Sequence, residues 1–358
     1  MTQQTTTRAT SVQRRGTKDR SLALNIRPFD YTDADYEALV AVCNAIEPER
    51  PSSVPAYRHW DNNRESQYHF RRYLAELNGQ VVATAATGHA AWSHQPHKFF
   101  VNVQVLPEHQ GKGIGARMYA RLLAHLEPRE PRKLVSYTRE HRENAIRFLK
   151  RRGFRQVMRI PVSTLDPATF DNERFALKVH RVLDSGITIK TLQEVSEQDP
   201  DWKRKLYDLE WECVQDVPST DPFTRRSFET FENAVLQSPN LLPDAWFVAV
   251  DGERYVGLSV LWRNLVTDKL LETGLTGVVR SHRRRGIATA MKVRAIEYAQ
   301  ANGNPLIDTD NEENNPMFQL NLQLGFVPQP AHLDFEMKLA DETSDTASSN
   351  GQRAKLEE

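Results

Sequence analysis

Hydrophobic and polar positions along the chain alternate between a period of two residues and a period of three to four, which predicts strands and helices in turn. Residues 24–28 are typical of a first strand. Thr32, followed three residues later by Asp35, is typical of the N-cap of a helix whose apolar face carries Tyr36 and Leu39. Strands and helices that alternate in this order predict an α/β (α+β) architecture.

A hairpin follows the first helix. Residues 72–77 and 80–88 flank Asn78-Gly79, a strong signal for a two-residue turn. Gly153 is placed to end the last helix of this half of the chain, as glycine often does. The other elements predicted in this half are strands at 98–106 and 133–138 and helices at 114–126 and 144–151.

The same order of elements recurs after Gly186, which indicates a duplicated domain. The turn 110–115 (Gln-Gly-Lys-Gly-Ile-Gly) has a counterpart at 283–288 (Arg-Arg-Arg-Gly-Ile-Ala), 173 positions later. The Gly-Phe pair at 153–154 recurs at 325–326, 172 positions later. We therefore expect a first domain at 24–162, a helical linker at 163–186, a second domain at 187–340, and disordered tails at 1–23 and 341–358.

The amino-acid composition excludes several classes of protein. Lys and Arg together number 47, as do Asp and Glu, so no net charge directs the chain to nucleic acid or to an anionic membrane. No apolar run approaches the roughly 18 residues of a membrane span. The two cysteines lie far apart, which excludes a disulfide framework and favours a reducing compartment. These features predict a soluble, cytoplasmic protein.

Both glycine-containing turns lie between a predicted strand and a predicted helix, where free backbone amides and the positive end of the helix dipole meet. This arrangement binds phosphate groups. However, Met118 stands where the third glycine of a dinucleotide-binding loop belongs, and neither turn has the Gly-Lys-Ser/Thr of a nucleotide-triphosphate loop. The turns therefore indicate a diphosphate site of another kind.

The stretch from Val103 to Gly115 resembles the strand-and-loop motif Q/R-x-x-G-x-G/A of the GNAT N-acetyltransferases, and residues 276–288 resemble it again. The resemblance covers nearly all of residues 24–339, and the tandem arrangement is similar to that of mycothiol synthase and related two-domain members. It implies two tandem GNAT domains, each with a mixed, splayed sheet flanked by helices. It also implies acetyl-CoA as the acetyl donor, without a metal ion.

The resemblance further implies that the loop amides bind the diphosphate of acetyl-CoA and that the preceding strand pairs with the extended pantetheine arm. The cofactor-binding residues implied in the first half are Val103, Val105, Gln110, Gly111, Lys112, Gly113, Ile114 and Gly115. Those implied in the second half are Thr276, Val278, Arg283, Arg284, Arg285, Gly286, Ile287, Ala288 and Asn314.

The two halves differ at the positions that carry chemistry in this family. Glu272 stands where some members carry a glutamate as general base, whereas the aligned residue of the first half is Phe99. The tyrosine that protonates the departing thiolate in the family is replaced by Asn321 in the second half and by Leu149 in the first. The resemblance therefore implies Glu272 and Asn321 as catalytic residues and places catalysis in the C-terminal domain.

Three classes of function stay open. We favour an enzyme that moves an acetyl group to a primary amine of a small molecule. The alternatives are a protein-lysine acetyltransferase and a non-catalytic CoA-binding or interaction protein. Glu272 favours chemistry over the last of these, and the segment 210–238 is expected to cover the acceptor.

Two further sequence features indicate no additional partner. His89, His94 and His97 lie close together, but one His-x-x-His without another nearby ligand does not predict a metal site. The three arginines at 283–285 already have a role on a diphosphate, so they do not predict nucleic acid binding. We expect a monomer or a homodimer that binds neither nucleic acid nor membrane.

Overall fold

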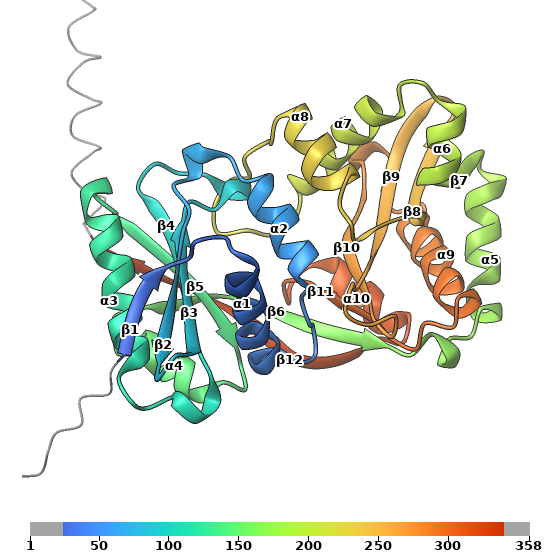
Figure 1. Ribbon diagram of the computed structural model, residues 1–358. Coiled ribbons are helices and arrows are strands. Elements are labelled where there is room, and N and C mark those ends of the chain that lie inside the picture. The colour runs from blue at the N-terminus through green and yellow to red at the C-terminus, as the bar shows by residue number, and fades with distance from the viewer. Residues whose placement is uncertain (1–23, 340–358) are drawn as a thin grey trace, which may run out of the picture.

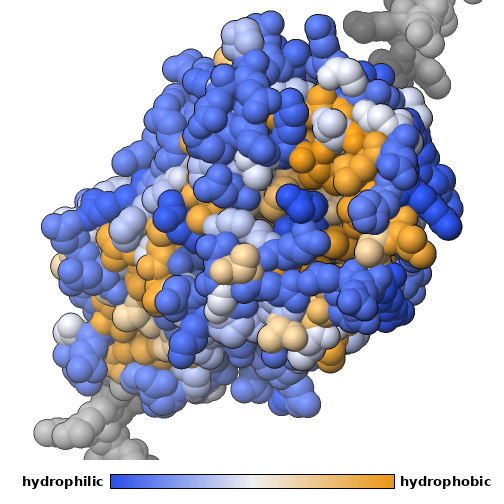
Figure 2. Space-filling model, turned by 90° about the vertical axis from the view of Figure 1, so that its right-hand side faces the viewer, coloured by the Kyte–Doolittle hydropathy of each residue, from blue (hydrophilic) through white to orange (hydrophobic). Residues whose placement is uncertain are grey.

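The computed structural model describes residues 24–339 (Figure 1). The tails expected at 1–23 and 341–358 lie outside the described residues. Within the described part, no helix is long and apolar enough to span a membrane. Figure 2 shows that the end of the molecule turned toward the viewer is covered mainly by hydrophilic side chains, with apolar groups gathered in separate areas.

The N-terminal half follows the order predicted from the sequence. Its strands are β1 (Leu24–Pro28), β2 (Arg71–Leu77), β3 (Gln80–Gly88), β4 (Lys98–Val105), β5 (Lys133–Arg139) and β6 (Arg155–Leu165). Its helices are α1 (Asp33–Ile46), α2 (Val54–Asn62), α3 (Ile114–Leu126) and α4 (Glu143–Lys150), and α5 (Glu173–Asp184) leads to the C-terminal half.

The C-terminal half repeats this order. Its strands are β7 (Ile187–Thr191), β8 (Leu241–Asp251), β9 (Arg254–Arg263), β10 (Leu271–Val278), β11 (Ile307–Asp310) and β12 (Val327–Lys338). Its helices are α6 (Leu192–Gln198), α7 (Trp202–Val214), α8 (Phe228–Phe231), α9 (Ile287–Ala301) and α10 (Pro316–Gln323). Helix α8 continues into a π-helix at Glu232–Leu236.

Local sequence signals explain the elements that form as expected. The Thr32 side chain accepts a hydrogen bond from the amide of Asp35 and caps α1. Asn78 and Gly79 both adopt positive φ, 53° and 81°, in the turn between β2 and β3, which is the conformation that a two-residue hairpin requires. In the second half, Asp251 at the end of β8 pairs with Arg254 at the start of β9, so the hairpin turns at Gly252 and Glu253. The α/β fold class with two repeats is confirmed.

The two halves share one twelve-stranded mixed sheet because they exchange their last strands. The strand order is β1-β2-β3-β4-β5-β12-β6-β11-β10-β9-β8-β7. Thus β12, the last strand of the chain, pairs with β5 of the N-terminal half, and β6 pairs with β11 of the C-terminal half. Figure 1 shows β6 and β12 between the two halves.

The exchange of β6 and β12 means that the boundaries expected at residues 162 and 186 do not separate the strands of one half from those of the other. Strand β6 continues to Leu165, so the segment expected as linker begins inside the sheet. In addition, β12 completes the sheet of the N-terminal half although it lies within the range expected for the second domain. The expected boundaries stay a prediction about where the sequence repeats begin and end. The sheet of each half includes a strand from outside the range expected for that half.

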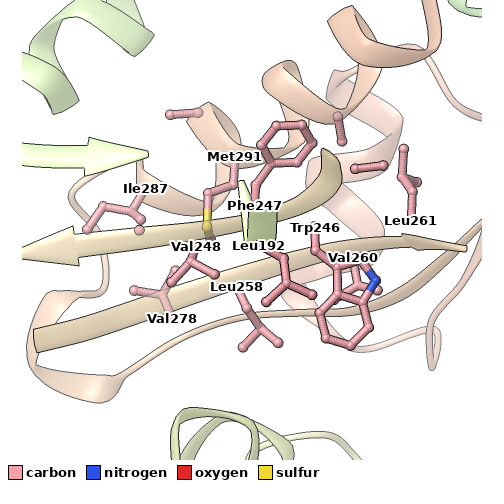
Figure 3. Packing of buried hydrophobic residues seen from close by; sticks show 14 of the residues in the cluster. Leu192, Trp246, Phe247, Val248, Leu258, Val260, Leu261, Val278, Ile287 and Met291 are labelled. Carbon is pink, nitrogen blue, oxygen red and sulfur yellow. The ribbon is translucent and has the colours of Figure 1, made fainter. Parts of the chain in front are cut away.

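The hydrophobic cores follow the exchanged strands. Leu333 and Phe335 of β12 lie in the core of the N-terminal half, together with Leu122 and Leu126 of α3. The core of the C-terminal half includes Leu165 of β6. Part of this second core is seen in Figure 3, where Met291 and Ile287 of α9 lie on one side of β8 and β9 and Trp246 and Val260 lie on the other.

The exchange predicts that a residue near the C-terminus stabilises the N-terminal half. The Phe335 side chain is fully buried, so Phe335→Ala should lower the free energy of unfolding by about 3–5 kcal/mol. Amide hydrogen exchange should accelerate in β5, the pairing partner of β12. Val327→Ala, at an exposed position of the same strand, is the control, and equal effects of the two variants on β5 would contradict the prediction.

Candidate active site

Both halves contain a place where two neighbouring parallel strands separate. Strand β10 pairs with β11 only at Leu271 and Glu272. Strand β4 likewise pairs with β5 only at Lys98 to Phe100. Beyond these pairs, the described structure gives β4 and β10 no ladder partner on that side, so each presents an open edge to which an extended polyamide can hydrogen-bond.

The loop that follows each open strand has the same backbone in both halves. Gly113 and Gly286, the N-caps of α3 and α9, have φ of 81° and 85°. Gly111 and Arg284, also 173 positions apart, have φ of 73° and 64°. The matching positive φ values show that the sequence repeat extends to the conformation of the loops.

Side chains anchor the two loops in the same way. The Gln110 amide donates to the carbonyl of Val105 at 3.1 Å, and the Arg283 guanidinium donates to the carbonyl of Val278 at 2.9 Å. Each loop is thereby fixed against the end of its strand, with the first amides of the following helix directed outward. The residues present therefore fit a diphosphate group in both halves.

The second loop carries more positive charge than the first. Arg283 and Arg280 both pair with Asp216, which follows α7. These two arginines hold the pKa of the Asp216 carboxyl below its ordinary value, although burial opposes the shift. Arg285 contacts the hydroxyl of Ser185 at the end of the linker helix, at 3.3 Å. The arginines predicted for the cofactor are thus gathered on one exposed loop.

The strand that leads to the second loop contains a β-bulge that its counterpart lacks. Thr273 lies opposite Leu261 and Thr276 lies opposite Ser259, so β10 has one residue more than β9 between these pairs. The pairing of β4 with β3 is regular throughout. A bulge interrupts the ladder and leaves backbone groups unpaired, so β10 offers free amides that β4 does not.

Glu272 lies at the last paired position before β10 and β11 separate. It lies beside Asp308 of β11 in the sheet, and its carboxylate accepts a hydrogen bond from Asn264 at 2.9 Å. The aligned Phe99 is buried and lies against the ring of His89, with ring centroids 4.1 Å apart. The C-terminal half thus has a half-buried carboxylate at the point where its N-terminal counterpart has a core side chain.

An arginine of the N-terminal half reaches this carboxylate cluster. Arg50, in the loop after α1, pairs with Asp308 and with Asp310, the latter at 3.0 Å. In the same loop, the carbonyl of Pro51 accepts a hydrogen bond from Asn264 at 2.8 Å. The site of the C-terminal half is therefore completed by residues of the other half.

Asp308 is unusual among these acids. Burial raises the pKa of its carboxyl to about 6, against the opposing effect of Arg50. One of its carboxylate oxygens is buried without a hydrogen-bond partner. The sequence analysis singled out neither Asp308 nor Arg50. The only signal in the sequence was the alternation of Asp308 and Asp310 at the end of an apolar strand.

The side chain of Asn321 is shielded from solvent. It is fully buried in α10, and its amide donates to the side chain of Asn311 at 2.6 Å while its oxygen has no partner. Asn314, predicted to contact the cofactor, is exposed in the loop before α10 and is hydrogen-bonded to Glu312. The roles proposed for both asparagines stay predictions.

Comparison with known proteins identifies the family. The chain belongs to the acetyltransferase (GNAT) family, whose model matches residues 36–154 and 203–326. Both matches fall on the repeats found in the sequence. Among the residues described by the structure, no group of three or more His, Cys, Asp or Glu side chains is placed to hold a metal ion.

Solved structures show the same fold. A GCN5-related N-acetyltransferase from Sphaerobacter thermophilus aligns with a TM-score of 0.63 at 19% identity, over 89% of this chain and 96% of that chain. A tandem GNAT protein from the clavulanic acid biosynthesis pathway aligns with a TM-score of 0.69 at 16% identity, over 89% of this chain and 99% of that chain. No curated protein sequence matches the chain. Family and fold together support acyl transfer in general.

The contact between Arg50 and Asp308 predicts a pH-dependent effect on stability. The raised pKa means that protonation of Asp308 stabilises the folded state at low pH and that this contribution is lost as pH rises through about 6. Arg50→Met removes the cation that compensates ionised Asp308. The free energy of unfolding should therefore fall by about 3 kcal/mol at pH 8 and by less at pH 5.

Denaturant unfolding at both pH values measures this effect. Arg294→Met is the control, because Arg294 pairs with Glu297 on the exposed surface of α9 and should change stability by about 0.5 kcal/mol or less. A loss for Arg50→Met that is as large at pH 5 as at pH 8 would show that Arg50 acts through packing alone.

Proposed function

We propose that the protein is an acetyl-CoA-dependent N-acetyltransferase that acetylates a primary amine of a small molecule, with catalysis in the C-terminal half. The observation that carries the proposal is the position of Glu272 beside a β-bulge and at the point where β10 and β11 separate. No other described strand combines an open edge, a bulge and a carboxylate in this way.

When bound, acetyl-CoA supplies an acetyl group activated as a thioester. The residues that would hold it are the amides of Arg283 to Ala288 for the diphosphate and the open edge of β10 for the extended arm. The unpaired amides of the bulge are placed to donate hydrogen bonds to the acetyl oxygen, where negative charge develops during transfer.

Glu272 acts as the general base in this proposal. The acceptor's nitrogen forms a bond to the acetyl carbon while the carbon–sulfur bond breaks, and the proton lost by the nitrogen passes to Glu272. Asn264 holds the Glu272 carboxylate in position with a hydrogen bond of 2.9 Å. CoA leaves as its thiolate, which takes a proton from water or from the acceptor's ammonium group.

The first prediction concerns Glu272. Glu272→Gln keeps the size of the side chain but removes its basicity, so kcat/KM should fall about 10²- to 10⁴-fold. The affinity for acetyl-CoA should be retained. Release of CoA from a panel of amines measures the rate, and calorimetric titration measures the affinity.

Phe99→Leu is the matched control for Glu272→Gln, because it changes the aligned residue of the N-terminal half. It should alter stability without lowering kcat/KM of the folded fraction. Wild-type turnover by Glu272→Gln across the pH range would contradict the assignment. Bound acetyl-CoA with no turnover of any amine or peptide would favour the CoA-binding alternative instead.

The second prediction concerns Arg284, which adopts the left-handed φ of 64° that its counterpart Gly111 adopts without a side chain. Arg284→Gly relieves this conformation, so the free energy of unfolding should rise by about 1 kcal/mol. The affinity for acetyl-CoA should fall about two- to fivefold, because an exposed charge contact is worth about 0.2–1 kcal/mol. The reciprocal change Gly111→Arg should lower stability, and tighter binding by Arg284→Gly would contradict the placement of the diphosphate.

A further inference from the structure

A small cavity lies beside β10, the strand that carries Glu272. Its volume is about 150 Å³. It is enclosed by α7, by α8 with its π-helix, and by strands β8, β9 and β10. Its lining residues are Leu206, Glu210, Arg226, Phe231, Val235, Trp246, Leu258, Val260, Trp262 and Leu275.

The cavity opens on the face of the sheet to which Glu272 points. Residues directly opposite in antiparallel strands point to the same face, and Glu272 lies opposite Trp262, which lines the cavity. Leu275 also lines it and lies within the bulge of β10. A molecule in the cavity therefore lies on the same face of the sheet as the Glu272 carboxylate and in contact with a residue of the bulge.

One polar group in the cavity wall has no partner in the protein. Trp246 is 3% exposed, and its indole N–H is buried without a hydrogen-bond acceptor. Trp246 lies opposite Val260 in the sheet, and Figure 3 shows both on the side away from α9. Buried indole N–H groups usually find an acceptor, so this one points to a ligand that supplies an oxygen.

The helical segment over the cavity supports the same interpretation. Phe231 and Val235 come from α8 and the π-helix that continues it. π-helices are rare and often occur at functional sites. Glu210 and Arg226, 3.7 Å apart, add one charge of each sign at the cavity. This segment lies in the range 210–238 that the sequence analysis expected to cover the acceptor.

We propose that this cavity binds the apolar part of the acceptor. The acceptor is a primary amine with one compact apolar group, of about the size of a six-membered ring. This group bears an oxygen that accepts a hydrogen bond from the indole N–H of Trp246. The inference rests on the proposed function for the reaction itself. A cavity of about 150 Å³ is large enough for one benzene ring. Glu210 and Arg226 pair with each other, and the rest of the lining is apolar apart from the indole N–H of Trp246, so the cavity favours one ring with one oxygen over two fused rings or a sugar with several hydroxyl groups.

The test compares four amines as acceptors for the full chain: tyramine, phenethylamine, putrescine and glucosamine. Tyramine has one ring with a hydroxyl group, and phenethylamine has the same ring without it. The kcat/KM should be highest for tyramine and at least tenfold lower for putrescine and glucosamine. Equal or better turnover of putrescine or glucosamine would overturn the proposal.

Three variants, at Trp246 and Val235, locate the effect in the cavity. Trp246→Phe keeps an aromatic ring but removes the N–H, so the KM for tyramine should rise about tenfold, while the KM values for phenethylamine and acetyl-CoA stay within twofold. Val235→Phe fills the cavity and should raise the KM for tyramine and for phenethylamine at least tenfold. Val235→Leu is a milder filling change whose effect should have the same direction. Thermal melting verifies that each variant folds.

Tyr73→Phe is the matched control, because Tyr73 lies 173 positions before Trp246 and is buried in the other core. It should leave all four KM values unchanged. An equal response of tyramine and phenethylamine to Trp246→Phe, or an equal response to Tyr73→Phe, would overturn the role of the indole.

Calorimetric titration with tyramine alone separates this inference from the proposed function. Tyramine binding to the wild type that is lost in Val235→Phe, without any turnover, would support the cavity and contradict the N-acetyltransferase activity. Turnover of an amine whose binding and KM are the same in Val235→Phe and in the wild type would support the activity and overturn the cavity as its acceptor site.

Discussion

Strand β12 hydrogen-bonds to β5 on one side and to β6 on the other, and the rest of the structure depends on this insertion. Without β12, β5 would be an edge strand that pairs only with β4, at its first three residues, and Phe335 would leave the N-terminal core. Without β6, β11 would lose its partner on the side opposite β10. The sheet of each half includes the last strand of the other half, so the two repeats share one continuous sheet.

The exchange brings the two halves close enough for each to reach the other's separating strands. Arg50, in the loop after α1, pairs with Asp308 and Asp310 of the C-terminal half. The loop after α7 sends Asp221 to Lys98 and to Lys133, the latter at 3.1 Å. Lys98 and Lys133 lie opposite each other at the start of β4 and β5. Both pairs of parallel strands are thus contacted by a charged residue of the other half, with the signs of charge reversed: Arg50 lies where β10 and β11 separate, and Asp221 lies where the pairing of β4 and β5 begins.

The sequence was sufficient to predict what depends on neighbours along the chain. The hairpin at Asn78-Gly79, the cap at Thr32, helix α3 and the repeat offset of 173 all follow from local propensity and periodicity, and the structure confirms them. The exchange of β6 and β12 could not be predicted in this way. Both strands have the same local pattern whether they pair within their own half or across, because only the partner differs.

The same limit applies to the site. Glu272 could be singled out because it stands at a motif position of the repeat, but Arg50 and Asn264 lie in loops without a motif. Their contacts with Asp308 and Glu272 join residues that are 258 and 8 positions apart. Asp308 itself lies in β11, a strand of four residues that was not predicted as an element. The raised pKa of the Asp308 carboxyl arises from burial between the halves, which no local sequence pattern can predict.

The two repeats have diverged most where the extended arm of a cofactor would lie. In the N-terminal half, Gln104 of β4 fills the space beside α1 and contacts the thiol of Cys43 at 3.2 Å. In the C-terminal half the equivalent residue is Gly277, and a Cβ atom there would lie 2.6 Å from that of Cys213 in α7. Helix α7 therefore packs directly on β10, and only glycine permits this approach. The bulge, Glu272 and this close packing distinguish β10 from β4, whereas the N-terminal half keeps the loop and carries larger side chains along its strand.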